Sequence, residues 1–215
     1  MTHTIVSIQA GGIQTTQDAF GNPWTSGYRK APVATPVLLK IQGLPGDDQY
    51  DKESHGGIDK ALLAYSFDYY PEWKTELGLS DLPAGSFAEN LTLSGINENE
   101  VCIGDIYQIG DEIILEVSQP RLPCKNINRF FGRNDMVKQV AEKGATGWYL
   151  RVIQGGLLSA EMPIKHLKRP YPQWTITRAH FLMRHAQEYP TEALEFAHCP
   201  ALESSWQQDL KSKVQ

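Results

Sequence analysis

All 18 glycines of this 215-residue chain lie at or before Gly156, and none follows. Glycine adopts the positive φ angles that tight turns need, so a glycine-rich stretch favours short elements joined by turns. A stretch without glycine is compatible with helices, which glycine weakens. The distribution therefore predicts a turn-rich body followed by a C-terminal segment of helical character.

Short apolar runs separated by turn signals fill the body. Residues 105–109 and 113–118 flank Gly110-Asp111, a typical hairpin turn. A helix is expected to begin near Tyr70, because Pro71 fits the first helical turn, and another over residues 134–143. Many short strands with glycine turns predict a mainly β fold, a barrel or a sandwich, interrupted by helices. Further strand candidates are residues 4–9, 37–41, 59–65, 147–153 and 163–169.

After Pro170 the pattern changes to three short helical stretches, of which the first is expected to be capped by Thr177 and the second opened by Pro190. We therefore assign residues 1–170 to one domain and 171–215 to a three-helix extension. A unit of about 40 residues is marginal alone. It is expected to pack on the body or on a partner chain, which makes a homodimer one expected assembly.

Composition and charge exclude several classes of protein. The chain has 20 Lys and Arg and 25 Asp and Glu, which gives a net charge of −5. This charge argues against a surface that binds a nucleic acid polymer. No apolar run approaches the roughly 18–20 residues of a membrane span, and the first residues lack the features of a signal peptide. The three cysteines have no C-x-x-C spacing, which argues against zinc and disulfide frameworks. We expect a cytoplasmic protein with free thiols.

Cys124 is the cysteine with the most distinctive surroundings. It follows a predicted strand in a loop stiffened by two prolines, and Arg121 and Lys125 lie close to it in the sequence. Nearby cations favour a thiolate and lower the pKa of a cysteine. The alternative is a buried loop cysteine that packs as a small hydrophobic residue. Cys102 and Cys199 are expected to be structural.

Several other residues are candidates for binding an anion. The run His55-Gly-Gly-Ile-Asp-Lys60 places two basic side chains around a Gly-Gly pair, whose backbone N–H groups can approach a ligand closely. A Gly-Gly turn with solvated charges is the alternative. Asn90 can fix a turn or bind a ligand. Arg151, a charge inside an apolar strand, pairs with a carboxylate or binds an anion.

Three segments in this order resemble one family. They are His55-Gly-Gly-Ile-Asp-Lys-Ala61, Glu89-Asn-Leu with Gly104-Asp105 downstream, and Ser118-Gln-Pro-Arg-Leu-Pro-Cys124. Together they resemble the MOSC domain, named after the C-terminal part of molybdenum cofactor sulfurases. The match runs from about residue 5 to residue 168, and the tail resembles the extension of the stand-alone bacterial YiiM-like subgroup. The resemblance implies a distorted β-barrel followed by three helices.

The resemblance also implies a cleft for the molybdenum cofactor, molybdopterin, with Cys124 as the catalytic residue and the protein ligand of the metal. A soft thiolate suits such a site. Residues 24–27 and Lys30 match a loop that the family places near this pocket. Two positions depart from the family pattern, because Ala88 replaces a usual glycine and Asn126 a frequent lysine. The residues expected to hold the cofactor are His55, Lys60, Asn90, Arg121, Lys125, Arg151 and Lys30.

The activity implied by the subgroup is the reduction of N-hydroxylated small molecules such as hydroxylaminopurine. The chain has no G-x-G-x-x-G fingerprint for a flavin or nicotinamide, so a separate flavoprotein reductase is expected to donate the electrons. One alternative is a non-enzymatic carrier or sulfur-relay protein for the cofactor, with Cys124 as a persulfide or transient ligand. Another is a pyridoxal-phosphate-type ligand, which would need a Schiff-base lysine such as Lys60.

Overall fold

The computed structural model describes residues 3–214 and has a closed β-barrel at its centre. The strand order β12-β8-β9-β10-β6-β7-β1 closes because β1 also pairs with β12. All of these pairs are antiparallel except β6 with β7. The mainly β barrel expected from the sequence is therefore confirmed. The barrel strands are β1 (His3–Ala10), β6 (Leu62–Ser66), β7 (Leu91–Ser94), β8 (Ile106–Ile109), β9 (Ile113–Pro120), β10 (Trp148–Gln154) and β12 (Pro163–Lys168).

Alternating side chains explain how β9 contributes to the barrel core. Ile113, Leu115 and Val117 share one face of the strand, and all three are buried. The hairpin to β8 turns at Gly110, whose φ of +56° lies in the left-handed region, and it pairs Ile109 with Ile113. This turn was predicted from the Gly-Asp pair, and it sets which face of β9 points into the core.

Short peripheral strands extend the barrel. Strand β4 (Ala31–Pro32) pairs with β1, while β5 (Val37–Leu39) pairs with β11 (Gly156–Leu158). Strands β2 (Gln14–Gln17) and β3 (Pro23–Ser26) form a separate hairpin. This hairpin was not predicted from the sequence, because β2 is polar throughout and carries no alternation of apolar residues.

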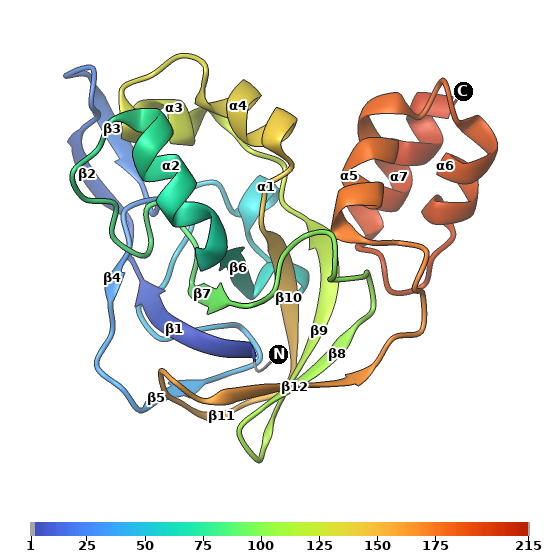
Figure 1. Cartoon of the computed structure of the whole chain (residues 1–215), viewed down its shortest axis with the longest axis horizontal. Helices are drawn as coiled ribbons and strands as arrows, with labels where there is room; N and C mark the ends of the chain where they lie inside the picture. The colour runs from blue at the N-terminus through green and yellow to red at the C-terminus, as the bar shows by residue number, and fades with distance from the viewer. Residues whose placement is uncertain (1–2, 215) are drawn as a thin grey trace.

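The helices of the body gather at one end of the barrel, where α2, α3 and α4 lie together (Figure 1). They enclose a second, largely aromatic cluster, in which the rings of Tyr65 and Phe87 stack at 4.3 Å. Helix α2 begins at Tyr70, as Pro71 predicted. The body helices are α1 (Lys52–His55), α2 (Tyr70–Leu77), α3 (Lys125–Phe131) and α4 (Met136–Lys143), with 3₁₀ turns η1 (Ile58–Lys60) and η2 (Phe67–Tyr69).

The strand expected over residues 59–65 is shifted toward the C-terminus. Residues 58–60 form the 3₁₀ turn η1, and the strand begins at Leu62. The Gly56-Gly57 pair causes this difference, since Gly57 has a φ of +99° and redirects the chain just before the turn. The loop that carries His55 and Lys60 is therefore compact, and it leads directly into a buried barrel strand.

Three helices follow the barrel, as predicted: α5 (Ile176–His185), α6 (Pro190–Ala197) and α7 (Ser204–Val214). The cap of α5 is Thr175, whose hydroxyl accepts a hydrogen bond from the Arg178 N–H at 3.0 Å. The predicted cap, Thr177, instead donates its hydroxyl to Asn99. Figure 1 shows the three helices on one side of the barrel, and one apolar cluster runs through both. The border at residue 170 stays a prediction.

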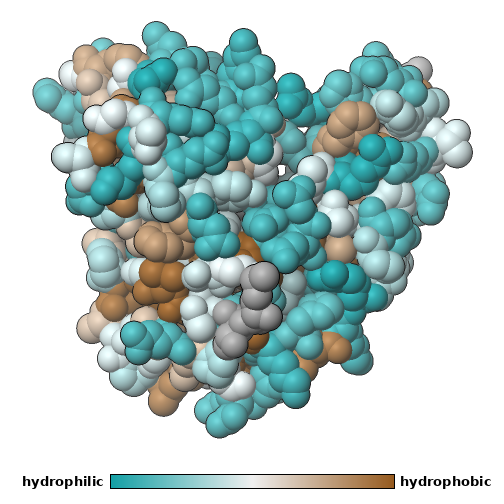
Figure 2. Space-filling view, in the orientation of Figure 1, coloured by the Kyte–Doolittle hydropathy of each residue, from teal (hydrophilic) through white to brown (hydrophobic). Residues whose placement is uncertain are grey.

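Hydrophilic side chains cover most of the molecular face in Figure 2. Apolar side chains gather on the part of this face that lies over β1 and β4. Among residues 3–214, no helix has the length and apolar character that crossing a membrane requires.

Candidate functional site

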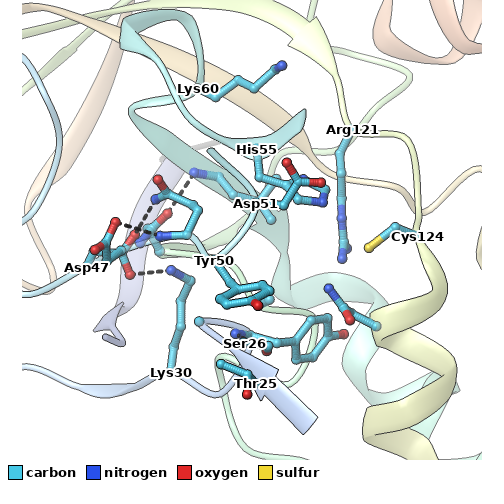
Figure 3. A pocket seen from close by; sticks show the side chains of 18 of the residues that line it. Thr25, Ser26, Lys30, Asp47, Tyr50, Asp51, His55, Lys60, Arg121 and Cys124 are labelled. Atoms are coloured by element: carbon cyan, nitrogen blue, oxygen red, sulfur yellow. Dashed lines mark hydrogen bonds and ion pairs between the residues drawn. The ribbon is translucent and has the colours of Figure 1, made fainter. Parts of the chain in front are cut away.

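A pocket of about 280 Å³ is formed where β3, α1 and the segment after β9 come together (Figure 3). Residues 24–27 contribute to its wall, as the resemblance to the family implied. Figure 3 shows Arg121 and Cys124 on one side of the pocket, with Lys30 and Asp47 on the other. Six of the eight predicted site residues line it: Lys30, His55, Lys60, Asn90, Arg121 and Cys124.

Cys124 occupies the N-cap position of helix α3, in an extended backbone conformation just beyond the end of β9. Its side chain is partly buried, and burial raises the pKa of the thiol. The His55 imidazole, the Arg121 charge and the Asn126 backbone N–H together outweigh this effect and lower the pKa to about 7. A large fraction of Cys124 is therefore thiolate at neutral pH, in the form that binds metals and attacks electrophiles.

Arg121 supplies a buried positive charge beside this thiol. The residue is 4% exposed, and its Nη1 atom has no hydrogen-bond partner among the described residues. Burial raises the pKa of the neighbouring phenols of Tyr28 and Tyr149, that of Tyr149 to about 12. Both phenols therefore stay uncharged at neutral pH and do not neutralise the guanidinium. A buried, unsatisfied cation is costly unless an anion pairs with it. The pocket therefore favours an anionic ligand at Arg121.

The loop from His55 to Lys60 brings two more basic side chains to the pocket. Helix α1 is capped by Asp51, which accepts a hydrogen bond from the Ser54 N–H at 3.0 Å. A Cβ atom at Gly56 would lie 2.6 Å from the Lys52 carbonyl oxygen, so only glycine fits this tight turn. The Lys60 ammonium donates to the Ser54 carbonyl at 3.0 Å.

Lys30 lines the pocket but already has a counter-ion. It forms a buried ion pair with Asp47, and the two side chains are only 6% and 4% exposed. Burial lowers the pKa of Lys30, although the carboxylate opposes this shift. Asp47 also accepts a hydrogen bond from the Gly11 N–H at 2.9 Å. Lys30 therefore contributes less net charge to the pocket than Arg121 does.

The side chain of Asn90 holds the backbone of two barrel strands together. Its Oδ1 accepts a hydrogen bond from the Leu63 N–H at 2.9 Å, and its Nδ2 donates to the Gln9 carbonyl at 3.2 Å. Both contacts are made to the strands β6 and β1, and the ligand-binding role of Asn90 stays a prediction. The adjacent Glu89 is fully buried and accepts hydrogen bonds from the Gly85 and Phe87 N–H groups, so it organises the same loop.

Two predicted cofactor ligands do not line the pocket. Lys125 is exposed at the first position of α3. Arg151 forms ion pairs with Asp59 and Glu116, so its alternative role as a carboxylate partner is the one observed. The charge inside the apolar strand was visible in the sequence, but its partners come from segments distant along the chain.

Other residues of the pocket were missed by sequence reasoning. Tyr28 and Tyr149 flank Arg121, while Asp47 and Tyr50 come from the acidic segment between Gly46 and Asp51. The sequence did not indicate these residues, because their neighbours in the pocket come from segments distant along the chain. Among residues 3–214, no group of three or more His, Cys, Asp or Glu side chains could hold a metal ion by itself.

A family model described as the MOSC domain matches residues 51–165, which is just over half of the chain and includes His55, Arg121 and Cys124. The chain belongs to the MOSC domain family. The predicted membership is thereby confirmed. The matched segment contains five of the seven barrel strands complete, β6 to β10, and the first half of β12.

Relatives of this MOSC protein include bacterial and fungal proteins. It is 33% identical to the uncharacterized protein YflK of Bacillus subtilis over 98% of this chain and 94% of that protein. It is 34% identical to a protein named "Reductase" of Gibberella moniliformis over 84% of this chain, which spans only 32% of that longer protein. The crystal structure of YiiM from Geobacillus stearothermophilus superposes with a TM-score of 0.83 at 30% identity, covering 99% of this chain and all of that one.

Proposed function

We propose that the pocket binds the molybdenum cofactor, with Cys124 as the protein ligand of the metal. The observation that carries this proposal is the buried, unpaired Nη1 atom of Arg121 beside a thiol whose pKa is lowered to about 7. A phosphate or a pterin oxygen would satisfy the guanidinium, and a thiolate is the soft ligand that a sulfur-bound metal accepts. The MOSC domain is associated with this cofactor.

The residues present fit such a group chemically. The cofactor brings two sulfur ligands of its own, so a single protein thiolate can complete its attachment. Arg121 would bind the anionic part, and His55 and Lys60 line the same pocket as further donors. Lys30 is held by Asp47, and Asn90 by the backbone, so these two residues would shape the wall of the pocket.

We infer that the protein reduces N-hydroxylated compounds. In this reaction an R–NHOH group takes up two electrons and two protons and gives R–NH2 and water. The bound cofactor would supply the chemistry that removes the oxygen and accepts the electrons. Cys124 would anchor it, and the walls of the pocket would limit access of water. The "Reductase" name of the fungal relative supports this class of reaction.

Tyr50 favours a flat substrate. Its side chain is 66% exposed at the pocket, and Figure 3 shows its ring between the Lys30 side and the Cys124 side. An aromatic face that is free to stack suits a planar heterocycle such as hydroxylaminopurine. We expect Tyr50→Ala to raise KM for this substrate several-fold and Tyr50→Phe to leave KM nearly unchanged in steady-state assays.

A separate flavoprotein is proposed as the electron donor. The fungal relative is about three times as long as the segment that matches this chain, so additional parts accompany the matched segment there. The 215 residues carry no G-x-G-x-x-G fingerprint for a flavin or nicotinamide, which supports an electron donor outside them. The donor would approach the pocket side, because electron transfer requires a short distance to the cofactor.

The test uses full-length protein made in cells that synthesise the cofactor. Purified protein is mixed with hydroxylaminopurine and a reduced donor, and the aminopurine formed is measured. We expect turnover by the wild type and by Cys102→Ser, a matched control, but none by Cys124→Ser. Reduction by Cys124→Ser at the wild-type rate would overturn the proposal. Cofactor binding without turnover would instead support the carrier alternative. An imine absorbance band would support the pyridoxal phosphate alternative.

A further inference from the structure

Arg151 links the pocket loop to the C-terminal helices. It lies in the middle of β10, and its Nε donates to a carboxylate oxygen of Asp59 in the 3₁₀ turn η1. Its Nη1 donates to Glu116 of β9 at 3.2 Å and to the carbonyl oxygen of Ala201, between α6 and α7, at 2.8 Å. One guanidinium thus joins the barrel wall, the pocket loop and the C-terminal unit.

A second contact connects the same three parts. The hydroxyl of Ser118 in β9 donates to the Asp59 carbonyl oxygen at 2.5 Å. The carbonyl oxygen of Ser118 accepts a hydrogen bond from the Glu203 N–H, just before α7, at 3.1 Å. Asp59 is therefore held through both its side chain and its main chain, each time by a residue that also binds the C-terminal segment.

The surroundings make this junction stronger than a surface ion pair. The Arg151 side chain is 17% exposed and faces two carboxylates and a carbonyl group, whereas exposed pairs contribute little. Asp59 immediately precedes Lys60, and the Gly56-Gly57 pair separates it from His55. Because glycines impose few restraints on the backbone, the position of this loop depends on how Asp59 is anchored.

We propose that the C-terminal helices brace the cofactor pocket, and that Arg151 is the positioning residue through which they fix the loop from His55 to Lys60. This inference rests on the proposed anion-binding role of the pocket. The C-terminal extension then has a function in shaping the site. Arg151 positions the loop and does not bind the ligand itself. A purely structural role would instead affect only the stability of the whole fold.

The test compares Arg151→Met with Arg178→Met in the full-length chain prepared without cofactor. Arg178→Met removes the ion pair with Glu192 inside the C-terminal unit, so it matches the loss of an ion pair without touching the loop. Two quantities are measured well below the unfolding temperature: hydrogen exchange of the loop amides, including the Lys60 N–H bonded to Gly57, and the affinity for inorganic phosphate.

We expect Arg151→Met to accelerate loop exchange at least tenfold and to weaken phosphate binding several-fold. Arg178→Met should change neither, even where it lowers the unfolding temperature equally, and Arg151→Lys should restore part of both. Asp59→Asn serves as a second variant if Arg151→Met does not fold. Loop exchange in Arg151→Met or Asp59→Asn as slow as in Arg178→Met would overturn the inference. Absence of phosphate binding by the wild type would contradict the proposed anion site. The hydrogen exchange of the loop would still show whether Arg151 and the C-terminal helices fix the loop.

Discussion

Among single residues, Cys124 differs from the other two cysteines in the charges that surround it. Burial raises the pKa of Cys102 and Cys199, which both lie in the apolar core. Cys124 is also partly buried, but Arg121 and His55 favour its thiolate. The sequence indicated that cations lower the pKa of Cys124, because Arg121 lies only three residues before it. It assigned part of the effect to Lys125, which is exposed and does not line the pocket.

Alkylation by iodoacetamide should therefore be fast and selective at Cys124. Because the thiolate is the reactive form, the rate should rise with pH and reach half of its plateau near pH 7. His55→Gln should shift this midpoint to higher pH, since one of the groups that favours the thiolate is lost. Mass spectrometry of the folded protein checks the site. A midpoint at or above pH 8.5, the usual range of a free cysteine, would contradict the proposed environment.

Ala88 has a backbone conformation that favours glycine, with a φ of +62°. This conformation costs a non-glycine residue about 1 kcal/mol, while glycine loses about as much through its greater freedom in the unfolded chain. We expect Ala88→Gly to change the free energy of unfolding by less than about 0.5 kcal/mol. The control Ala141→Gly, inside α4, should lose about 1 kcal/mol. Equal losses in urea unfolding would show that Ala88 is not strained.

At the scale of elements, local patterns predicted those strands and helices that carry their own signals. The β8–β9 hairpin and the start of α2 followed from a Gly-Asp turn and from Pro71. Helix α3 was missed because Cys124 occupies its N-cap without a side-chain capping bond. The cap of α5 was placed two residues late because both Thr175 and Thr177 are able to cap, and tertiary contacts decide between them.

Glu98 connects the segment before β8 to the start of β10. It is fully buried, accepts a hydrogen bond from the Gly147 N–H at 2.7 Å, and has no partner for Oε2 among the described residues. Burial raises its pKa from 4.5 to about 7. The folded state therefore binds more protons than the unfolded state between these pH values. Stability is fully present below pH 4.5 and falls as the pH rises toward 7.

Glu98→Gln should remove this pH dependence, because an amide has no charge to desolvate. Near pH 8 we expect the variant to be more stable than the wild type, by up to about 3 kcal/mol. Near pH 4 the two proteins should be similar. Urea unfolding at several pH values measures the effect. A variant that keeps the wild-type loss of stability between pH 5 and pH 7 would show that another group causes it.

For the whole molecule, the net charge of −5 hides a pocket in which basic side chains gather around one thiol. The family resemblance anticipated the barrel and the extension. Six of its predicted site residues line the pocket, since each of its motifs is contiguous in the sequence. It did not anticipate Tyr28, Tyr149 and Asp47, which reach the pocket through tertiary folding. Arg151 was misplaced for the same reason, because its partners lie on three separate segments.

The most direct test of the account is the molybdenum and pterin content of protein made in cells that synthesise the cofactor. We predict that the wild type retains both in equal amounts, that Cys124→Ser loses molybdenum, and that Arg121→Met loses the pterin as well. Cys199→Ser, in which a buried structural thiol is changed, should retain both. A wild-type protein without molybdenum or pterin, or a Cys124→Ser variant with the full wild-type content, would contradict the central claim.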